Sequence, residues 1–500
     1  MIAGEIETHH PIPPPASAAP RRWLGLAFIA LAQLMVALDA TIINIALPTV
    51  QRALAFSDAH RQWVITAYTL PFAGLLLLGG RMADTIGRKR AFLIGLAGFA
   101  AASALAGASP TLWVLIAARG LQGIFGALLA PSALSLLAVT FTEPRERAKA
   151  FAVYGAIAGS GAAAGLVLGG AITQSANWRW CLYINVAIAC AAFAGGLSTL
   201  GRVLPTGEQR LDIPGALLIT TGLVAIVFGC GNAATYAWAS AAVLTPLAVG
   251  LLLLAAFAAL EASSPAPLLP ISLVCERNRA GACLSAALAI VGMYGIFLLL
   301  TYYFQVVLGY SPLKAGLAFL PMTAASMLGA TTLATRLLPH IPPRAVLVPG
   351  LLVAAFGIAL LGRLDVRSRY LVDIFPAEVL IGLGIGCAMI TAFSVGTQAV
   401  DPRQAGIASA LVNASQQVGA SIGTALLNTV AASAAAGHMP IHANTRSTTS
   451  VALVHGYVVA AQYASVILTV GAALAALMIT TNAPPKINAP RAHGEIHPQT

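Results

Sequence analysis

Long apolar stretches alternate with short polar connections along the whole chain, and this alternation predicts its secondary structure. A helix that crosses a bilayer needs about 20 mostly apolar residues. Fourteen stretches satisfy that length, over residues 23–47, 62–80, 91–109, 111–137, 148–173, 179–200, 212–232, 239–260, 280–307, 315–337, 344–362, 371–394, 406–434 and 453–480. The pattern therefore predicts an all-α integral membrane protein with fourteen transmembrane helices.

Polar segments group these helices as six, two and six. We expect an N-terminal tail, a six-helix bundle, a linker with two extra helices, a second six-helix bundle and a C-terminal tail, over residues 1–22, 23–200, 201–279, 280–480 and 481–500. No charged residue lies between Asp212 and Glu261, so the two extra helices are expected to face lipid.

The composition favours a membrane protein and argues against several other classes. Of the 500 residues 58% are hydrophobic, and the mean hydropathy is +0.85, more apolar than a soluble globular protein requires. The six cysteines show no Cys-x-x-Cys or Cys/His spacing, so we expect neither a disulfide framework nor a metal site. The net charge is +11, but the bases form no compact patch, so a nucleic-acid partner is not expected. An enzyme is not expected either, because no nucleophile–base pair or phosphate-binding loop is visible.

The positive charges indicate how the chain is oriented. With both termini in the cytoplasm, eighteen of the 27 Lys and Arg residues fall on the cytoplasmic side and eight on the outer side, while only Arg119 falls within a predicted span. Cytoplasmic loops of membrane proteins carry such an excess. We therefore expect a multi-pass protein of the cytoplasmic (inner) membrane with both termini inside the cell.

An unusual concentration of charge marks residues 80–92, Gly-Arg-Met-Ala-Asp-Thr-Ile-Gly-Arg-Lys-Arg-Ala-Phe, between the second and third spans. Its two glycines suit sharp turns or close packing, and Asp84 precedes Arg88 by four residues, the favourable order for a helical ion pair. An ordinary stop-transfer loop would show the same features. The stretch also resembles the loop between helices 2 and 3 of major facilitator superfamily transporters. That resemblance implies a conformational latch made of Gly80, Asp84, Gly87, Arg88 and Arg90.

Two charged residues, Asp39 and Arg119, lie inside the first and fourth spans at comparable depth. An ionised carboxylate costs about 2.5–3.5 kcal/mol at the centre of a membrane helix, so its presence indicates function or pairing. Two interpretations stay open. The pair is either a static tie between two helices or a proton-binding carboxylate controlled by Arg119.

The residues around this pair resemble the fourteen-helix drug:proton antiporters of the same superfamily. Asp39-x-Thr41-x-x-Asn44 is similar to their helix 1 signature. Arg119-Gly-Leu-Gln122 resembles their helix 4 motif, whose arginine is implicated in proton coupling.

A glycine series in the fifth span resembles the antiporter motif of these transporters, and consists of Gly161, Gly165, Gly169 and Gly170. The first three share one helical face and permit close packing. The motif usually has proline where this chain has Leu166, and that departure puts the export direction in question.

Glu378, in the twelfth span, is the other acid well inside a predicted helix. It is either a second protonation or cation site or a residue near the outer surface. The tenth span has no acid, and the thirteenth offers only neutral amides such as Asn413 and Gln416, so a divalent-cation substrate is not expected.

Aromatic and polar residues on the expected cavity-side helices are candidates for a substrate pocket, since such pockets are mostly apolar with a few polar groups. They are Asn44, Tyr68, Gln122, Tyr294, Tyr302, Phe304, Gln305, Asn413 and Gln416. Tyr302 lies near the end of a span, where an interfacial anchor is the alternative.

The resemblance implies the major facilitator fold, with two pseudo-symmetric six-helix bundles. It also implies proton-coupled export of small hydrophobic or monocationic drugs or toxic compounds by alternating access, with Asp39 and Arg119 in proton coupling. Glu378 joins them as a candidate for proton coupling because of its place inside a span. The expected partners are the substrate, protons and the lipid bilayer, and the protein is expected to be a monomer. No cofactor is expected, because the proton gradient drives transport. Whether membrane-fusion or outer-membrane proteins are also partners stays open. The alternatives are a dedicated exporter of one metabolite, sugar or antibiotic, and a non-transporting membrane sensor.

Overall fold

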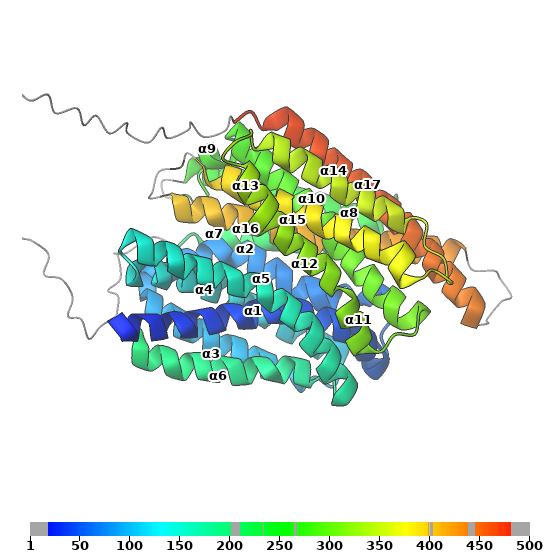
Figure 1. Ribbon diagram of the computed structural model, residues 1–500, viewed down its shortest axis with the longest axis horizontal. Helices are drawn as coiled ribbons and strands as arrows, with labels where there is room; N and C mark the ends of the chain where they lie inside the picture. Colours follow the sequence, from blue (N-terminus) through cyan, green and yellow to red (C-terminus); the bar gives the residue numbers. More distant parts are fainter. Residues whose placement is uncertain are drawn as a thin grey trace, which may run out of the picture.

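The computed structural model describes residues 19–201, 211–233, 235–264, 267, 269–398, 400, 404–438 and 446–481. Within these residues, fourteen helical segments are long and apolar enough to cross a membrane, as the sequence predicted. They run side by side along one direction (Figure 1). The predicted fold class is confirmed.

The N-terminal half consists of α1 (Ala19–Leu54), α2 (Trp63–Ile86), α3 (Arg88–Gly107), α4 (Leu112–Thr140), α5 (Pro144–Ser175) and α6 (Trp180–Thr199). A short 3-10 turn, η2 (Asp58–His60), precedes α2. The first helix is longer than predicted, because it continues through Pro48 where the prediction ended it. Membrane helices tolerate such a proline when neighbouring helices pack around it, and α1 packs against both α5 and α6.

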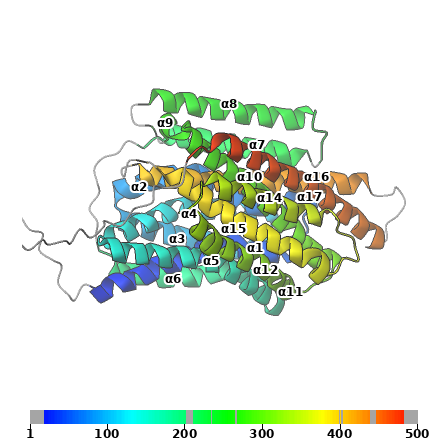
Figure 2. The ribbon, with the colours of Figure 1, turned by 45° about the horizontal axis from the view of Figure 1, so that its top comes forward.

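The two extra helices are α7 (Ile213–Asn232) and α8 (Ala241–Ser263). Figure 2 shows α8 outermost, and Leu252 on it is 70% exposed. By contrast, α7 packs against both halves. Its Thr220 contacts the N-terminal half, since a Cβ added to Gly74 of α2 would lie 2.2 Å from Thr220 Oγ1. Its Cys230 contacts the C-terminal half, where Thr429 Oγ1 donates to Cys230 O at 3.0 Å. The expectation that both extra helices simply face lipid is therefore wrong for α7.

The C-terminal half follows a one-turn helix, α9 (Ile271–Val274). Its six spans are built from α10 (Arg277–Tyr302) with η3 (Tyr303–Val307); α11 (Pro312–Ala318), α12 (Leu320–Leu328), η4 (Gly329–Ala334) and α13 (Thr335–Leu337); α14 (Arg344–Leu361); η5 (Tyr370–Ile374) with α15 (Phe375–Thr397); α16 (Ala405–Gly437); and α17 (Arg446–Met478). The segments η3, η4 and η5 are π-helical turns within or at the ends of spans.

The helices of the two halves pair in the same order. In the N-terminal half α1 packs with α5, α2 with α4 and α3 with α6; in the C-terminal half α10 packs with α16, α12 with α15 and α14 with α17. Glycines let the helix backbones approach closely in both halves. A Cβ added to Gly79 would lie 2.2 Å from Ala127 O, and a Cβ added to Gly419 would lie 2.3 Å from Ala287 O. The halves are thus two copies of one packing arrangement.

The start of α1 and the end of α17 lie at the same end of the bundle, the left in Figure 1. We call this end the terminal face and the opposite end the far face. Near the far face the halves touch where α5 meets α11 and where α2 meets α16. Apolar contacts on the α16 side continue toward the terminal face through Ala414 and Ala410.

Along α5 the two halves separate toward the terminal face. Leu166 and Gly170 pack against α11, since a Cβ on Gly170 would lie 2.5 Å from Pro312 O. Gly159 and Gly155 continue the same helical stripe, and a Cβ on either would meet nothing within 4 Å. The molecule is therefore closed at the far face and parted beside α5 at the terminal face.

Candidate functional site

A buried ion pair joins α1 and α4. Asp39 and Arg119 are 0% and 1% exposed, and Arg119 Nη1 donates to Asp39 Oδ2 at 2.6 Å. The structure thus brings together the two charges that the sequence singled out. Removing an ion pair from water is costly unless further hydrogen bonds satisfy the remaining donors and acceptors.

Two amides complete the surroundings of the carboxylate. Gln122 Nε2 and Asn185 Nδ2 donate to Asp39 Oδ1 at 3.2 and 2.7 Å. Asp39 therefore accepts hydrogen bonds from three N–H donors, as an acceptor-only carboxylate can. A protonated carboxyl group would have to direct its O–H toward one of these donors. The geometry therefore fits ionised Asp39.

Arg119 is fixed from the other side. Its Nε donates to Val64 O at 3.1 Å, and its Nη1 also donates to Gln122 Oε1 at 3.0 Å. The guanidinium lies over the Tyr68 ring, 4.6 Å from the centroid, and Gln122 Nε2 donates to Ser103 Oγ at 2.7 Å. The cluster thus draws on five helices, α1, α2, α3, α4 and α6, all in the N-terminal half.

The glycine series of α5 packs against the same turn of α1. A Cβ on Gly165 would lie 2.1 Å from Thr41 Oγ1 and 2.9 Å from Leu38 O. A Cβ on Gly161 or Gly169 would also come within 2.9 Å of α1 atoms. These three glycines therefore hold α5 against the residues on either side of Asp39.

Gly170 has a different partner. It packs against α11 at Pro312. In return, Gly316 of α11 packs against α5, since a Cβ added to Gly316 would lie 2.3 Å from Leu166 O. The series therefore links α1 on one face of α5 with the C-terminal half on another.

The loop predicted as a latch connects α2 and α3. Arg88 Nε donates to Asp84 Oδ1 at 3.0 Å, as the four-residue spacing predicted. Gly87 has φ 93°, in the region that favours glycine, and so makes the sharp turn. Gly80 is not at a close approach, since its added Cβ would stand 3.7 Å from Pro131 Cβ, and Arg90 is exposed.

Glu378 is 0% exposed near the start of α15 and so lies toward the far face of the C-terminal half. Tyr370 Oη lies 2.6 Å from Ala318 O and 3.1 Å from Glu378 Oε2. The Tyr370 hydroxyl has one hydrogen to donate, and the backbone carbonyl of Ala318 can only accept. Both hydrogen bonds of Tyr370 Oη therefore form only if Glu378 carries a proton and donates it to this oxygen. The structure does not bring Glu378 together with Asp39 and Arg119.

The candidate substrate residues lie in three different surroundings. Tyr68 and Gln122 belong to the ion-pair cluster. Asn44 is 1% exposed and donates to Ala40 O within its own helix at 3.1 Å. Half-buried positions on α10 and α16 are occupied by Tyr294, Asn413 and Gln416.

The remaining candidates lie at the far face. Phe304 is 0% exposed and packs edge-to-face on Phe319, with ring centroids 5.2 Å apart. Gln305 Nε2 donates across the halves to Ile45 O at 2.8 Å, and Tyr302 donates to Gln51. These residues help close the far face.

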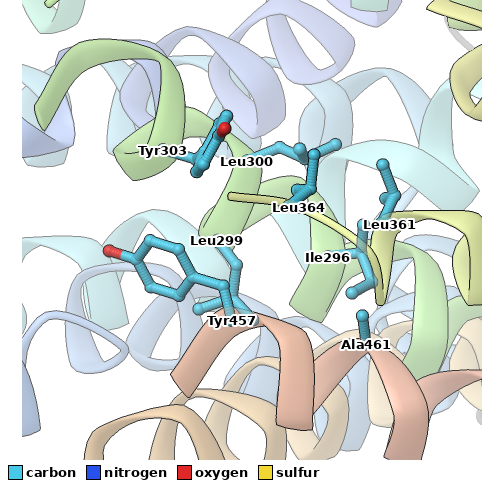
Figure 3. Close-up of a pocket in the computed structure, with 8 residues that line it drawn as sticks. All are labelled: Ile296, Leu299, Leu300, Tyr303, Leu361, Leu364, Tyr457 and Ala461. Atoms are coloured by element: carbon cyan, nitrogen blue, oxygen red, sulfur yellow. The ribbon is translucent and has the colours of Figure 1, made fainter. Parts of the chain in front are cut away.

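A small apolar cavity lies within the C-terminal half (Figure 3). It is lined by Ile296, Leu299, Leu300, Tyr303, Leu361, Leu364, Tyr457 and Ala461. Its volume of about 10 Å³ is close to the minimum for one water molecule, whereas ligand pockets measure about 300–1,000 Å³. It is therefore a packing defect and not a substrate pocket.

Ser103 and Asn185 were not among the predicted site residues. Both are isolated polar residues inside apolar helices, and this was the available signal. The partners of Arg61 at the far face were not predicted either, because Arg61 stands in a short connection like other loop bases.

Comparisons with known proteins agree on the type of molecule. A family model described as Major Facilitator Superfamily matches residues 29–424. A puromycin resistance protein of Streptomyces alboniger is 50% identical over 463 residues, 92% of each chain. A cephamycin export protein of Amycolatopsis lactamdurans is 38% identical, over 83% of this chain and 86% of its own.

Among solved structures, a bacterial homologue of the human lysosomal transporter Spinster, in an inward-facing and unoccupied conformation, superposes with a TM-score of 0.66. The match covers 92% of this chain and 97% of the other at 17% identity, which supports the fold.

Proposed function

Because the chain belongs to the major facilitator superfamily, we propose that it exports small, mostly apolar or monocationic molecules across the cytoplasmic membrane in exchange for protons. Family membership makes it a membrane transporter and not an enzyme. Relatives that confer resistance or export antibiotics support transport out of the cell. The observation that carries proton coupling is the buried carboxylate group of Asp39, which accepts hydrogen bonds from Arg119, Gln122 and Asn185.

In this proposal the terminal face is cytoplasmic, as the excess of Lys and Arg on that side favours. The structure then represents the state closed to the outside, with Asp39 unprotonated. Substrate binds from the cytoplasm in this state. After the switch, a proton from outside neutralises Asp39, which weakens its ion pair with Arg119 and favours substrate release and reset.

The route from proton to gate runs through α5. Protonation changes the contacts of Asp39 on α1, and the glycine series ties that turn of α1 to α5. Because α5 also carries the far-face contact of Gly170 with Pro312, a shift of α1 against α5 alters the seam between the halves. The Asp84–Arg88 loop acts as the latch that favours one access state.

The test is proton movement in inside-out vesicles that hold a respiration-driven pH gradient. Vesicles with the wild-type protein receive lipophilic dyes and antibiotics, beginning with puromycin because of the most similar relative described above. A substrate should collapse the gradient with wild type and not with Asp39→Asn. Glu143→Gln, an exposed acid at the start of α5, is the matched control and should behave as wild type.

Coupling that persists in Asp39→Asn would refute the role of Asp39. If no compound on a broad panel moves protons, the multidrug proposal fails, and a non-transporting sensor gains support if labelled compounds also stay in place.

A second candidate is a dedicated exporter of one compound. It is favoured by the relatives described above, each of which is named for a single antibiotic. Mutual competition distinguishes the two: a multidrug exporter shows competition among unrelated compounds, whereas a dedicated exporter moves protons with one compound and its close analogues only.

A further inference from the structure

At the far face, an arginine of the N-terminal half is inserted into the C-terminal half. Arg61 precedes α2 and is only 2% exposed. Its guanidinium lies over the ring of Tyr302 on α10, 4.2 Å from the centroid, and its Nε donates to Asn428 Oδ1 on α16. A buried cation of this kind needs partners that replace its water.

Most of those partners come from the C-terminal half. The hydroxyl of Tyr457, on α17, is buried beside the guanidinium, and in Figure 3 it points away from the apolar cavity. Among the described residues, the acid paired with Arg61 is Asp58 of the N-terminal half, whose Oδ1 lies 3.9 Å from Arg61 Nη1 and whose side chain is 50% exposed. The charge is therefore held mainly by an aromatic face and an amide oxygen, with a phenol hydroxyl beside it.

Further bonds fix this arrangement while the halves are closed. Asn428 Nδ2 donates to Gln62 Oε1 at 2.8 Å and to Asp58 O at 3.1 Å, and Tyr302 donates to Gln51. All of these acceptors belong to the N-terminal half. Tyr302, Asn428 and Tyr457 stay together when the halves part, because α10, α16 and α17 pack on one another.

An outward-open state must withdraw Arg61 from this place. Three neutral groups, the Tyr302 ring, the Asn428 amide oxygen and the Tyr457 hydroxyl, then line a position that had held a single positive charge. Aromatic faces recognise organic cations, whereas a divalent metal ion prefers several charged oxygen ligands. The vacated position is thus suited to an organic monocation.

We propose that Tyr302, Asn428 and Tyr457 form a monocation site at the outer mouth, that Arg61 is its tethered occupant in the closed state, and that an exported organic cation replaces Arg61 when the far face opens. The proposal rests on the export function above and adds to it a subsite for the monocationic molecules among the substrates. Competition between arginine and cation then couples cation binding at the mouth to opening of the gate.

The experiment measures opening of the far face without substrate or proton gradient. Ser421 of α16 is 0% exposed, and its Oγ lies 2.6 Å from Thr69 Oγ1 of α2, so it reports on the seam. In a chain whose six cysteines are replaced, Ser421→Cys is labelled in whole cells with an impermeant maleimide. Arg61→Ala should be labelled about tenfold faster or more, the shift expected when a desolvated cation–π contact is lost.

Free guanidinium then tests the site itself. Guanidinium chloride at concentrations that do not unfold the protein should slow the labelling of Arg61→Ala toward the wild-type rate. Equal concentrations of sodium chloride, which controls for ionic strength, or of urea, the neutral analogue, should not. Adding Tyr302→Leu to Arg61→Ala should abolish the rescue.

Unchanged labelling of Arg61→Ala would overturn the proposal, and so would fast labelling that guanidinium does not slow. If Arg61→Ala does not fold, Arg61→Lys keeps the test open, because ammonium lacks the planar fork and should give labelling between that of wild type and that of an open gate. Labelling of Arg61→Lys at the wild-type rate would then overturn the proposal. The result is independent of the vesicle assay, so a failure of proton-coupled export and a failure of this site are distinguishable.

Discussion

The ion pair between Asp39 and Arg119 makes an asymmetric prediction about stability. In Asp39→Asn the side chain keeps its shape, but its NH2 must face a donor: either Arg119 on one side, or Gln122 and Asn185 on the other. The arginine cannot lose its charge. We expect a cost of about 3–5 kcal/mol, typical of a buried charge that has lost its partner.

Arg119→Gln should cost less, about 1–3 kcal/mol. Asp39 keeps the two amide donors on Oδ1, and its carboxylate can bind a proton and become neutral. The double variant Asp39→Asn/Arg119→Gln has no buried charge at this place. It should therefore be more stable than Asp39→Asn alone, with a coupling of about 2 kcal/mol or more.

Denaturant unfolding in detergent, followed by circular dichroism, measures the four members of this cycle. Glu143→Gln serves as the exposed-acid control and should match wild type. A lower stability of Arg119→Gln than of Asp39→Asn would contradict this account of the ion pair, and so would single effects that simply add in the double variant.

Three further predictions concern the glycine series, the buried glutamate and the loop. Gly165→Ala places a Cβ 2.1 Å from Thr41 Oγ1 and should lower the free energy of unfolding by about 1–3 kcal/mol through overpacking. The control Gly155→Ala, whose Cβ meets nothing within 4 Å, should be neutral, and equal thermal unfolding of the two variants in detergent would contradict this. Glu378→Gln keeps a donor for Tyr370 Oη and should retain stability and transport, whereas Glu378→Ala should lower the free energy of unfolding by about 1–3 kcal/mol. A Glu378→Gln variant as defective as Glu378→Ala would show that a titrating carboxyl group is required. Asp84→Asn should change stability by less than about 1 kcal/mol, because its pair with Arg88 is partly exposed, but should change far-face thiol labelling; unchanged labelling together with unchanged transport would remove the latch hypothesis.

Local patterns were sufficient for the spans and for part of the site. Fourteen apolar stretches gave fourteen helices, because in lipid every backbone group must be satisfied within its own helix. Asp39 and Arg119 were visible for the same reason, since a charge inside an apolar helix is costly and rarely accidental. The ion pair at Asp84 and Arg88 followed from spacing within one helix end.

Only the tertiary structure decided which helix faces meet. Membrane helices are apolar nearly all round, so their composition does not show which side contacts protein and which contacts lipid. This is why α7 was misassigned to lipid, and why the amides around Asp39 were incompletely predicted. The bond from Arg61 to Asn428 joins residues 367 positions apart, and neither residue's neighbours in the chain indicate the other. The sequence by itself determined where the chain crosses the membrane and which charges it carries inside; packing between distant helices determined what those charges touch and where the two halves close.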